Sequence, residues 1–430
     1  IKKWIGTKMF YSLREKYTDN LFVLLLVFTG GGLLFVFNRN LMYYIFTALL
    51  VIVILLNFFK LKRELTNSII FTTISILSLF IINFFFAVSE QSLDKYLYYV
   101  TVVLSSVMFY VHFKNNRGNQ IFLLRLNFIL KMIFLHALVN FIAYFFVNDQ
   151  LFEISSEYYS CKTYNYLFYY ASDEINLSVM NLFGVEFCRN QGLFWEPGVL
   201  QIYLNLFFFL QAFIFKQNRW LLLIGFVILG TYSTTGILIL IGQLVYLFIQ
   251  RFNENKLFIP IIFLSFIPIY FVFSINVEEK LRGNRVFSFQ KRLFDFTQPL
   301  FIAASHPLTG VGLDLDQFQK LRYEFYIDNE SLELINETLG VSLKAAGTSA
   351  GSANSITFLI AAMGFPTGIL FVFMFLRQKI INDHRLIFYF IVFASVMAEP
   401  LFLRPFFFVF IISGFYHYFL KFTGNSVEIS

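Results

Sequence analysis

The chain is poor in charged residues. Asp, Glu, Lys and Arg make up 14% of its 430 residues, whereas hydrophobic residues make up 58% and phenylalanine alone occurs 62 times. Soluble domains carry about 25% charged and about 45–50% apolar residues. A surface with so little charge excludes an ordinary water-soluble domain, and it predicts a protein whose solvent is lipid.

Other features are also scarce. The only two cysteines, Cys161 and Cys188, fall in one predicted outer loop where oxidation is feasible, but two cysteines alone fix no geometry, so a disulfide stays open. No cluster of metal ligands is visible, and we expect neither a metal site nor a cofactor. The first 19 residues are charged and no A-x-A site follows the first apolar run, so no cleavable signal peptide is expected.

The formal charge of +7 raises the question of nucleic-acid binding. Lys and Arg occur in short clusters between apolar runs, however, which is how the positive-inside rule distributes them in membrane proteins. We therefore expect membrane lipid, and no nucleic acid, as a partner.

Apolar runs of transmembrane length recur along the chain. A hydrocarbon core about 30 Å thick needs roughly 20 apolar residues per helix. The sequence predicts an all-α polytopic membrane protein of about 12 segments, at roughly 20–37, 41–59, 68–88, 96–112, 121–147, 199–215, 220–231, 235–250, 257–274, 355–376, 386–398 and 402–420.

The region 220–250 decides the orientation. One helix of this length would measure about 46 Å at 1.5 Å per residue, too long without strong tilt. The polar, glycine-flanked sequence G-T-Y-S-T-T-G around Tyr232 predicts a broken pair of short helices instead. Both termini are then cytoplasmic, whereas a single helix would place Arg251, Arg377 and Arg385 outside, against the positive-inside rule.

A polar break is tolerated in lipid only where it lines a protein-enclosed or watery cavity. The break therefore indicates a site near the outer half of the membrane, with a loosely packed hairpin as the alternative. The predicted topology divides the chain into N-terminal transmembrane helices (1–147), a first periplasmic loop (148–198), central helices (199–274), a second periplasmic loop (275–354) and C-terminal helices with a short cytoplasmic tail (355–430).

The first outer loop ends in C-R-N-Q-G-L-F-W-E-P-G, directly before an apolar helix. Proline suits a helix start and a preceding glutamate suits its positive end, which is a purely structural explanation of Glu196. The functional alternative is that Glu196 takes a proton from a sugar hydroxyl while Arg189 binds phosphate. Trp195 is a candidate for stacking on a sugar.

The second outer loop contains a helix-like stretch from Arg285 to Ala304 and a basic cluster that opposes the usual charge bias. An anionic lipid headgroup or a pyrophosphate accounts for such a cluster, and simple solvated charge is the alternative. The cluster consists of Arg282, Arg285, Lys291 and Arg292.

Three further features complete the predicted outer face. His306, before a proline, is as consistent with a turn as with a ligand-binding role. The segment 347–352 is flexible by composition and suits a lid. Glu399 and Arg404, near the last outer turn, are expected to pair with each other in a mainly structural role.

Together these motifs resemble the O-antigen ligase and O-antigen polymerase superfamily of bacterial envelope glycosyltransferases. The resemblance covers roughly residues 185–376 and the number of segments. It depends on R-N-Q-G-L-F-W-E-P-G, T-Y-S-T-T-G, R-L-F-D-F-(x8)-S-H-P-L-T-G-V-G and A-N-S-I-T-F-L-I-A-A-M-G-F-P-T-G.

The resemblance implies a metal-independent glycosyltransferase of the GT-C type in the bacterial inner membrane, with its active site facing the periplasm. Its substrates would be undecaprenyl-diphosphate-linked glycans. A polymerase moves the growing O-antigen or capsule chain onto a new lipid-linked repeat unit, and a ligase moves it to lipid A core. A lipid-linked oligosaccharide flippase or other transporter, and another family of membrane glycosyltransferases, are further alternatives; binding of a chain-length regulator stays open.

The resemblance also implies residue roles. Arg189 and Arg292 would stabilise the departing diphosphate, as fixed cations do better than water. Many relatives, ligases especially, begin the helix after the second loop with His-Asn, but this chain has Ala353-Asn354, which argues against a ligase and makes Glu196 the candidate general base. The expected substrate-binding residues are Arg285, Arg282, His306, Tyr232, Asn354 and Trp195.

Overall fold

The computed structural model describes residues 13–56, 63–116, 118–156, 159–171, 179–182, 185–251, 258–281, 286–322, 333, 336–338 and 352–422. Each apolar segment predicted from the sequence contains a helix, so the mostly helical prediction is confirmed. Within these described residues, five helical spans are long and apolar enough to cross a membrane, and shorter apolar helices accompany them. The five are Asn67–Phe86, Leu93–Lys114, Gly118–Gln150, Pro197–Ile214 and Ser355–Leu376.

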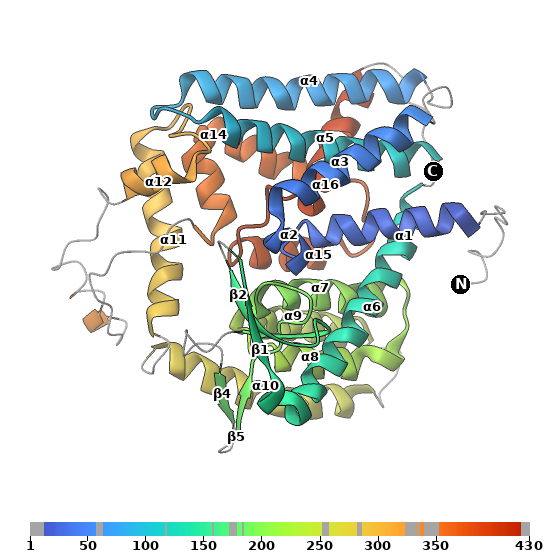
Figure 1. The fold of residues 1–430 in the computed structure, drawn as a ribbon, viewed down its shortest axis with the longest axis vertical. Coiled ribbons are helices and arrows are strands. Elements are labelled where there is room, and N and C mark those ends of the chain that lie inside the picture. Colours follow the sequence, from blue (N-terminus) through green and yellow to red (C-terminus); the bar gives the residue numbers. More distant parts are fainter. Residues whose placement is uncertain are drawn as a thin grey trace.

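The helices form two groups joined by a crossing helix (Figure 1). One group contains α3 (Arg39–Leu56), α4 (Arg63–Phe86), α5 (Leu93–Asn116), α14 (Ser355–Leu376) and α16 (Pro405–Phe422). The other contains α6 (Gly118–Val147), α7 (Pro197–Phe209), α8 (Leu221–Gly230), α9 (Thr234–Arg251) and α10 (Phe258–Leu281). Between them lie α1 (Leu13–Phe28), α2 (Leu33–Phe37) and α15 (Arg385–Val396), while α11 (Val286–Ser305) crosses one side of the molecule.

The predicted break in region 220–250 is confirmed. Helix α8 ends at Gly230 and α9 begins at Thr234. The carbonyls of Gly230 and Thr231 accept hydrogen bonds from the Asn190 amide and the Arg189 Nε, each at 3.0 Å. The break is therefore not left unsatisfied, because the end of the first loop fills it.

Two further breaks in apolar helices were not predicted. At Gly30–Gly32, between α1 and α2, the Gly31 carbonyl accepts from the Trp195 amide at 3.1 Å. In α14, Gly364 has a non-helical backbone (φ 79°), and the freed carbonyls of Ala361 and Ala362 accept from the Val311 and Gly312 amides at 2.9 and 2.8 Å. The segment S-H-P-L-T-G-V-G (305–312) therefore packs into the kink of α14, which lies in A-A-M-G-F-P (361–366).

The first loop region contains β-structure that the all-α prediction lacked. Strands β1 (Phe152–Ser155), β2 (Ser160–Tyr164) and β3 (Phe168–Ala171) form an antiparallel sheet, and β4 (Val179–Leu182) pairs with β5 (Val185–Cys188). Cys161 in β2 and Cys188 in β5 are both buried free thiols, so the structure has no disulfide between them.

The predicted helix of the second loop is confirmed as α11, which is followed by α12 (Leu315–Arg322). A buried ion pair joins them: Arg322 Nη2 lies 2.6 Å from Asp295 Oδ1, and both side chains are at most 1% exposed. The other carboxylate oxygen of Asp295 accepts from the Ala353 amide at 2.9 Å, and its carbonyl accepts from Thr357 Oγ1 at 3.0 Å. Asp295 therefore fixes the start of α14 against α11.

A basic cluster occupies the ends of several helices. Lys114, at the end of α5, lies 5.8 Å from the centre of the Tyr416 ring in α16. Desolvation, and then repulsion from Arg385, Lys421 and Arg377, lowers the pKa of Lys379. These cations therefore gather at one end of α5, α14 and α16.

Replacing Arg322 by leucine leaves the Asp295 carboxylate buried without its counter-charge. Loss of one partner of a buried ion pair costs about 3–5 kcal/mol, so we expect a marked fall in the melting temperature of the detergent-solubilised protein, followed by tryptophan fluorescence. Lys95→Leu is the matched control, because Lys95 forms an exposed pair with Asp316 at 3.7 Å and exposed pairs contribute about 1 kcal/mol or less. Equal melting temperatures for the two variants would contradict the role of Asp295.

Candidate functional site

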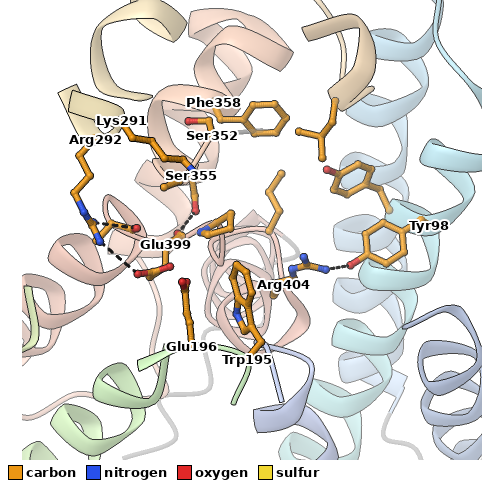
Figure 2. Close-up of a pocket in the computed structure, with 16 residues that line it drawn as sticks. Tyr98, Trp195, Glu196, Lys291, Arg292, Ser352, Ser355, Phe358, Glu399 and Arg404 are labelled. Atoms are coloured by element: carbon orange, nitrogen blue, oxygen red, sulfur yellow. Dashed lines mark hydrogen bonds and ion pairs between the residues drawn. The ribbon is translucent and has the colours of Figure 1, made fainter. Parts of the chain in front are cut away.

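A cavity of about 420 Å³ lies where several helices begin (Figure 2). Its lining comes from the start of α5, the residues before α7, helix α11, the start of α14 and the connection between α15 and α16. Helices α5, α14 and α16 run from this cavity to the basic cluster. The lining residues are Tyr98, Tyr99, Trp195, Glu196, Lys291, Arg292, Leu315, Ser352, Ala353, Ser355, Phe358, Ala398, Glu399, Pro400, Leu403 and Arg404.

Two carboxyl groups meet in this cavity. Glu196 is the N-cap residue of α7, and a hydrogen bond joins its side chain to that of Glu399. Glu399 is 5% exposed and packs over Gly198, where a Cβ atom would stand 2.2 Å from its Oε1. Gly198 therefore gives Glu399 the space to reach Glu196.

The environment of Glu399 favours its protonated form. Burial, and then the charge of Glu196 and the hydrogen bond between the two groups, raises the pKa of Glu399 well above its usual value. Arg292 and Arg189 act in the opposite direction but do not outweigh burial. Glu399 is therefore the member of the pair whose protonated form the surroundings favour.

Arg292 forms an ion pair with Glu399. Its Nη2 lies 3.7 Å from Glu399 Oε1, its Nη1 donates to the Ala398 carbonyl at 3.1 Å, and its side chain remains 36% exposed. Lys291 lines the same wall of the cavity (Figure 2). Arg189 does not line the cavity, although it is near enough to act on the charge of Glu399. The two arginines singled out by the sequence therefore act on one carboxyl group.

The opposite wall is aromatic and basic. Arg404 Nη1 donates to the hydroxyl oxygens of Tyr98 and Tyr43, the latter at 3.4 Å, and Trp195 lies between this wall and the carboxyl pair (Figure 2). The expected pairing of Glu399 with Arg404 is wrong. Glu399 pairs with Arg292, because the connection between α15 and α16 directs the two side chains to opposite walls.

Three expected substrate-binding residues lie outside the cavity lining. His306 is in the turn after α11, where its carbonyl accepts from the Gly310 amide at 3.2 Å, so the turn alternative describes its position. Tyr232 is buried in the break between α8 and α9 and packs against Phe141, Tyr144 and Val272. Its carbonyl accepts from Asn276 Nδ2 at 2.9 Å.

Asn354 caps α14. Its Oδ1 accepts from the amides of Ile356 and Thr357, each at 3.1 Å, so its side chain is occupied at the helix start. Its neighbours Ala353 and Ser355 do line the cavity. The expected sites at Arg282 and Arg285, and most of the expected lid at 347–352, lie outside the described residues.

Sequence reasoning missed two residues of the site, Glu399 and Ser355, of which Ser355 fixes the backbone at Glu399. Ser355 Oγ donates to the Glu399 carbonyl at 2.7 Å and accepts from the Leu401 amide at 2.8 Å. The only available signal was an acidic residue between two apolar runs. Nothing in the spacing of Glu196 and Glu399 along the chain predicts that they meet.

Within the described part of the chain, no three His, Cys, Asp or Glu side chains are grouped so that they could hold a metal ion. Comparison with protein-family models, curated proteins and solved structures finds no match to this chain.

The raised pKa of Glu399 makes stability depend on pH. The folded protein binds this proton more tightly than the unfolded chain, whose glutamate pKa is about 4.3. The resulting stabilisation is complete below that value and is lost as the pH rises through the folded pKa of Glu399. We expect the melting temperature of wild type minus that of Glu399→Gln to fall as the pH rises above about 5 and passes through the raised pKa of Glu399. A difference that stays constant or increases with pH would contradict the raised pKa of Glu399.

Proposed function

We propose that this chain polymerises undecaprenyl-diphosphate-linked oligosaccharide repeat units of O-antigen or capsule, as a metal-independent membrane glycosyltransferase. The observation that carries the proposal is the cavity in which one hydrogen-bonded carboxyl pair faces Arg292 and Lys291. A transfer from a diphosphate carrier requires these two chemistries, a proton acceptor and fixed positive charge.

The proposed reaction assigns a role to each wall residue. Glu196 accepts the proton of the acceptor hydroxyl as that oxygen forms a bond to the anomeric carbon. The bond between the anomeric carbon and the diphosphate oxygen breaks, and its electron pair leaves with the diphosphate. Arg292 and Lys291 stabilise the charge that develops on this leaving group. Glu399, whose protonated form is favoured by burial, contacts Glu196 and positions its side chain.

The position of Ala353 favours polymerase over ligase. It stands where the resembling family, ligases especially, has a histidine, and in this chain it lines the cavity. Its methyl group leaves no titratable side chain at that point, while Glu196 and Glu399 supply carboxyl groups to the same space. The base in this chain is therefore a carboxylate rather than an imidazole.

The proposed orientation places the cavity at the periplasmic face of the inner membrane and both termini in the cytoplasm. The support is the basic cluster at the end of α5, α14 and α16 that is remote from the cavity, because the positive-inside rule assigns such a cluster to the cytoplasm. The carrier diphosphate would then reach Arg292 from the outer leaflet.

Arg292→Ala removes the cation at the carboxyl pair. Loss of one preorganised stabilising group typically lowers a rate by about 10²–10³-fold. We therefore expect this variant to make only traces of polymer from purified lipid-linked repeat units. Arg292→Lys should retain more activity than alanine but less than wild type, because it keeps the charge and loses the fork. Arg377→Ala is the matched control, since Arg377 stacks on Phe373 (4.7 Å) at the far end of α14.

The same assay tests the reaction class. A ladder that persists in excess chelator, from the purified chain and lipid-linked units alone, agrees with a metal-independent polymerase. Transfer only to lipid A core would indicate a ligase, and movement of the lipid-linked unit between leaflets without any transfer would indicate a flippase. A full ladder from Arg292→Ala would refute the assignment of the cavity.

A further inference from the structure

Arg404 is a cation for which the described residues supply no counter-charge. Its hydrogen bonds go to the hydroxyl groups of two tyrosines, and no described Asp or Glu forms an ion pair with it. The side chain is half-buried and lines the cavity. A guanidinium withdrawn from water without an anion is costly, and the cost is recovered when an anion binds.

The surroundings hold this cation in place without neutralising it. The Tyr43 hydroxyl donates a hydrogen bond to the Thr29 carbonyl at 2.8 Å, and its oxygen accepts one from Arg404. Tyr43 and Tyr98 pack edge to face with ring centres 5.2 Å apart, and the centre of the Tyr98 ring lies 5.9 Å from the guanidinium carbon. Only Nη1 takes part in these hydrogen bonds, which leaves donors on Nε and Nη2.

The helix that follows increases the positive potential. Arg404 directly precedes Pro405, the first residue of α16, and its carbonyl accepts from the Phe408 amide at 2.9 Å. A cation is disfavoured at the positive end of a helix, where an anion is favoured. An anion at this point would therefore interact with both the guanidinium and the start of α16.

We propose that Arg404, with Tyr98 and Trp195 beside it, is a second oxyanion-binding subsite of the cavity, opposite the wall formed by Arg292 and the carboxyl pair. The proposal rests on the proposed function only for the origin of the ligand, which would be either an acidic sugar of the repeat unit or the diphosphate of the second lipid-linked substrate. Both carry oxygen anions that a guanidinium binds in a fork. The flanking Tyr98 and Trp195 rings suit a sugar attached to that anion.

Binding to the purified full-length chain in nanodiscs tests the subsite without any transfer reaction. The probes are a short oligosaccharide ending in glucuronate, its matched glucose-ended form, and inorganic pyrophosphate, titrated by calorimetry. We expect wild type to bind at least one anionic probe, Arg404→Gln to weaken that binding at least 10-fold, and Arg404→Lys to weaken it less. Loss confined to glucuronate indicates an acidic sugar, and loss confined to pyrophosphate indicates the second diphosphate.

Two controls separate binding from folding. Tyr98→Phe removes a hydrogen bond and keeps the charge, so it should lower the melting temperature, and its affinity for the anionic probe should fall less than that of Arg404→Gln. Arg377→Gln changes a cation at the other end of α14 and should leave both properties unchanged. Unchanged affinity in Arg404→Gln, or no binding of either anionic probe by wild type, overturns the subsite. If these binding results are as expected but Arg292→Ala still makes polymer, the anion subsite at Arg404 is supported and the proposed polymerase site is refuted.

Discussion

An apolar surrounding offers no water to the peptide groups of a broken helix. This constraint governs the structure, because three apolar helical segments among the described residues are interrupted, at Gly30–Gly32, between Gly230 and Thr234, and at Gly364. At each interruption a loop segment supplies amide or guanidinium donors to the freed carbonyls. At the first two interruptions the donors belong to the end of the first loop, which also carries Arg189, Trp195 and Glu196, so the contacts that satisfy the backbone there also position the site.

The electrostatics of the cavity follow from where these loops end. Glu196 stands at the start of α7, and Glu399 reaches it over a residue that has no side chain. Burial and the charge of Glu196 raise the pKa of Glu399, because like charges in a poorly solvated space repel. Arg292 contacts both the Ala398 carbonyl and the Glu399 carboxyl group. These two contacts fix the position of the guanidinium relative to the carboxyl group.

Much of the helical framework was predictable from hydropathy. The positions of the apolar helices, the break before Thr234 and the helix beginning at Val286 all depend on local composition, which a single sequence contains. The strands from Phe152 to Cys188 were not predictable in the same way, because short pairs depend on contacts between strands. The kink at Gly364 was also missed, since the residues that satisfy it lie some fifty positions earlier in the chain.

The site was predictable only in part. The motif that ends the first loop led to Glu196 and Trp195, and the basic cluster led to Lys291 and Arg292, all of which line the cavity. The contact between Glu399 and Glu196 joins segments about two hundred residues apart. Only the packing of α7 against the connection before α16 brings these segments together. Asn354 was selected for its motif, but a capping role already explains an asparagine before an apolar helix.

The partial exposure of Arg292 has a consequence for energetics across the bilayer. A proton that leaves or enters Glu399 through the mouth of this cavity exchanges with the solvent at one end of α5, α14 and α16, and the basic cluster lies at the other end of these helices. In the proposed orientation, a change in the pH of the periplasm would therefore reach Glu399 directly, whereas a change in the pH of the cytoplasm would not.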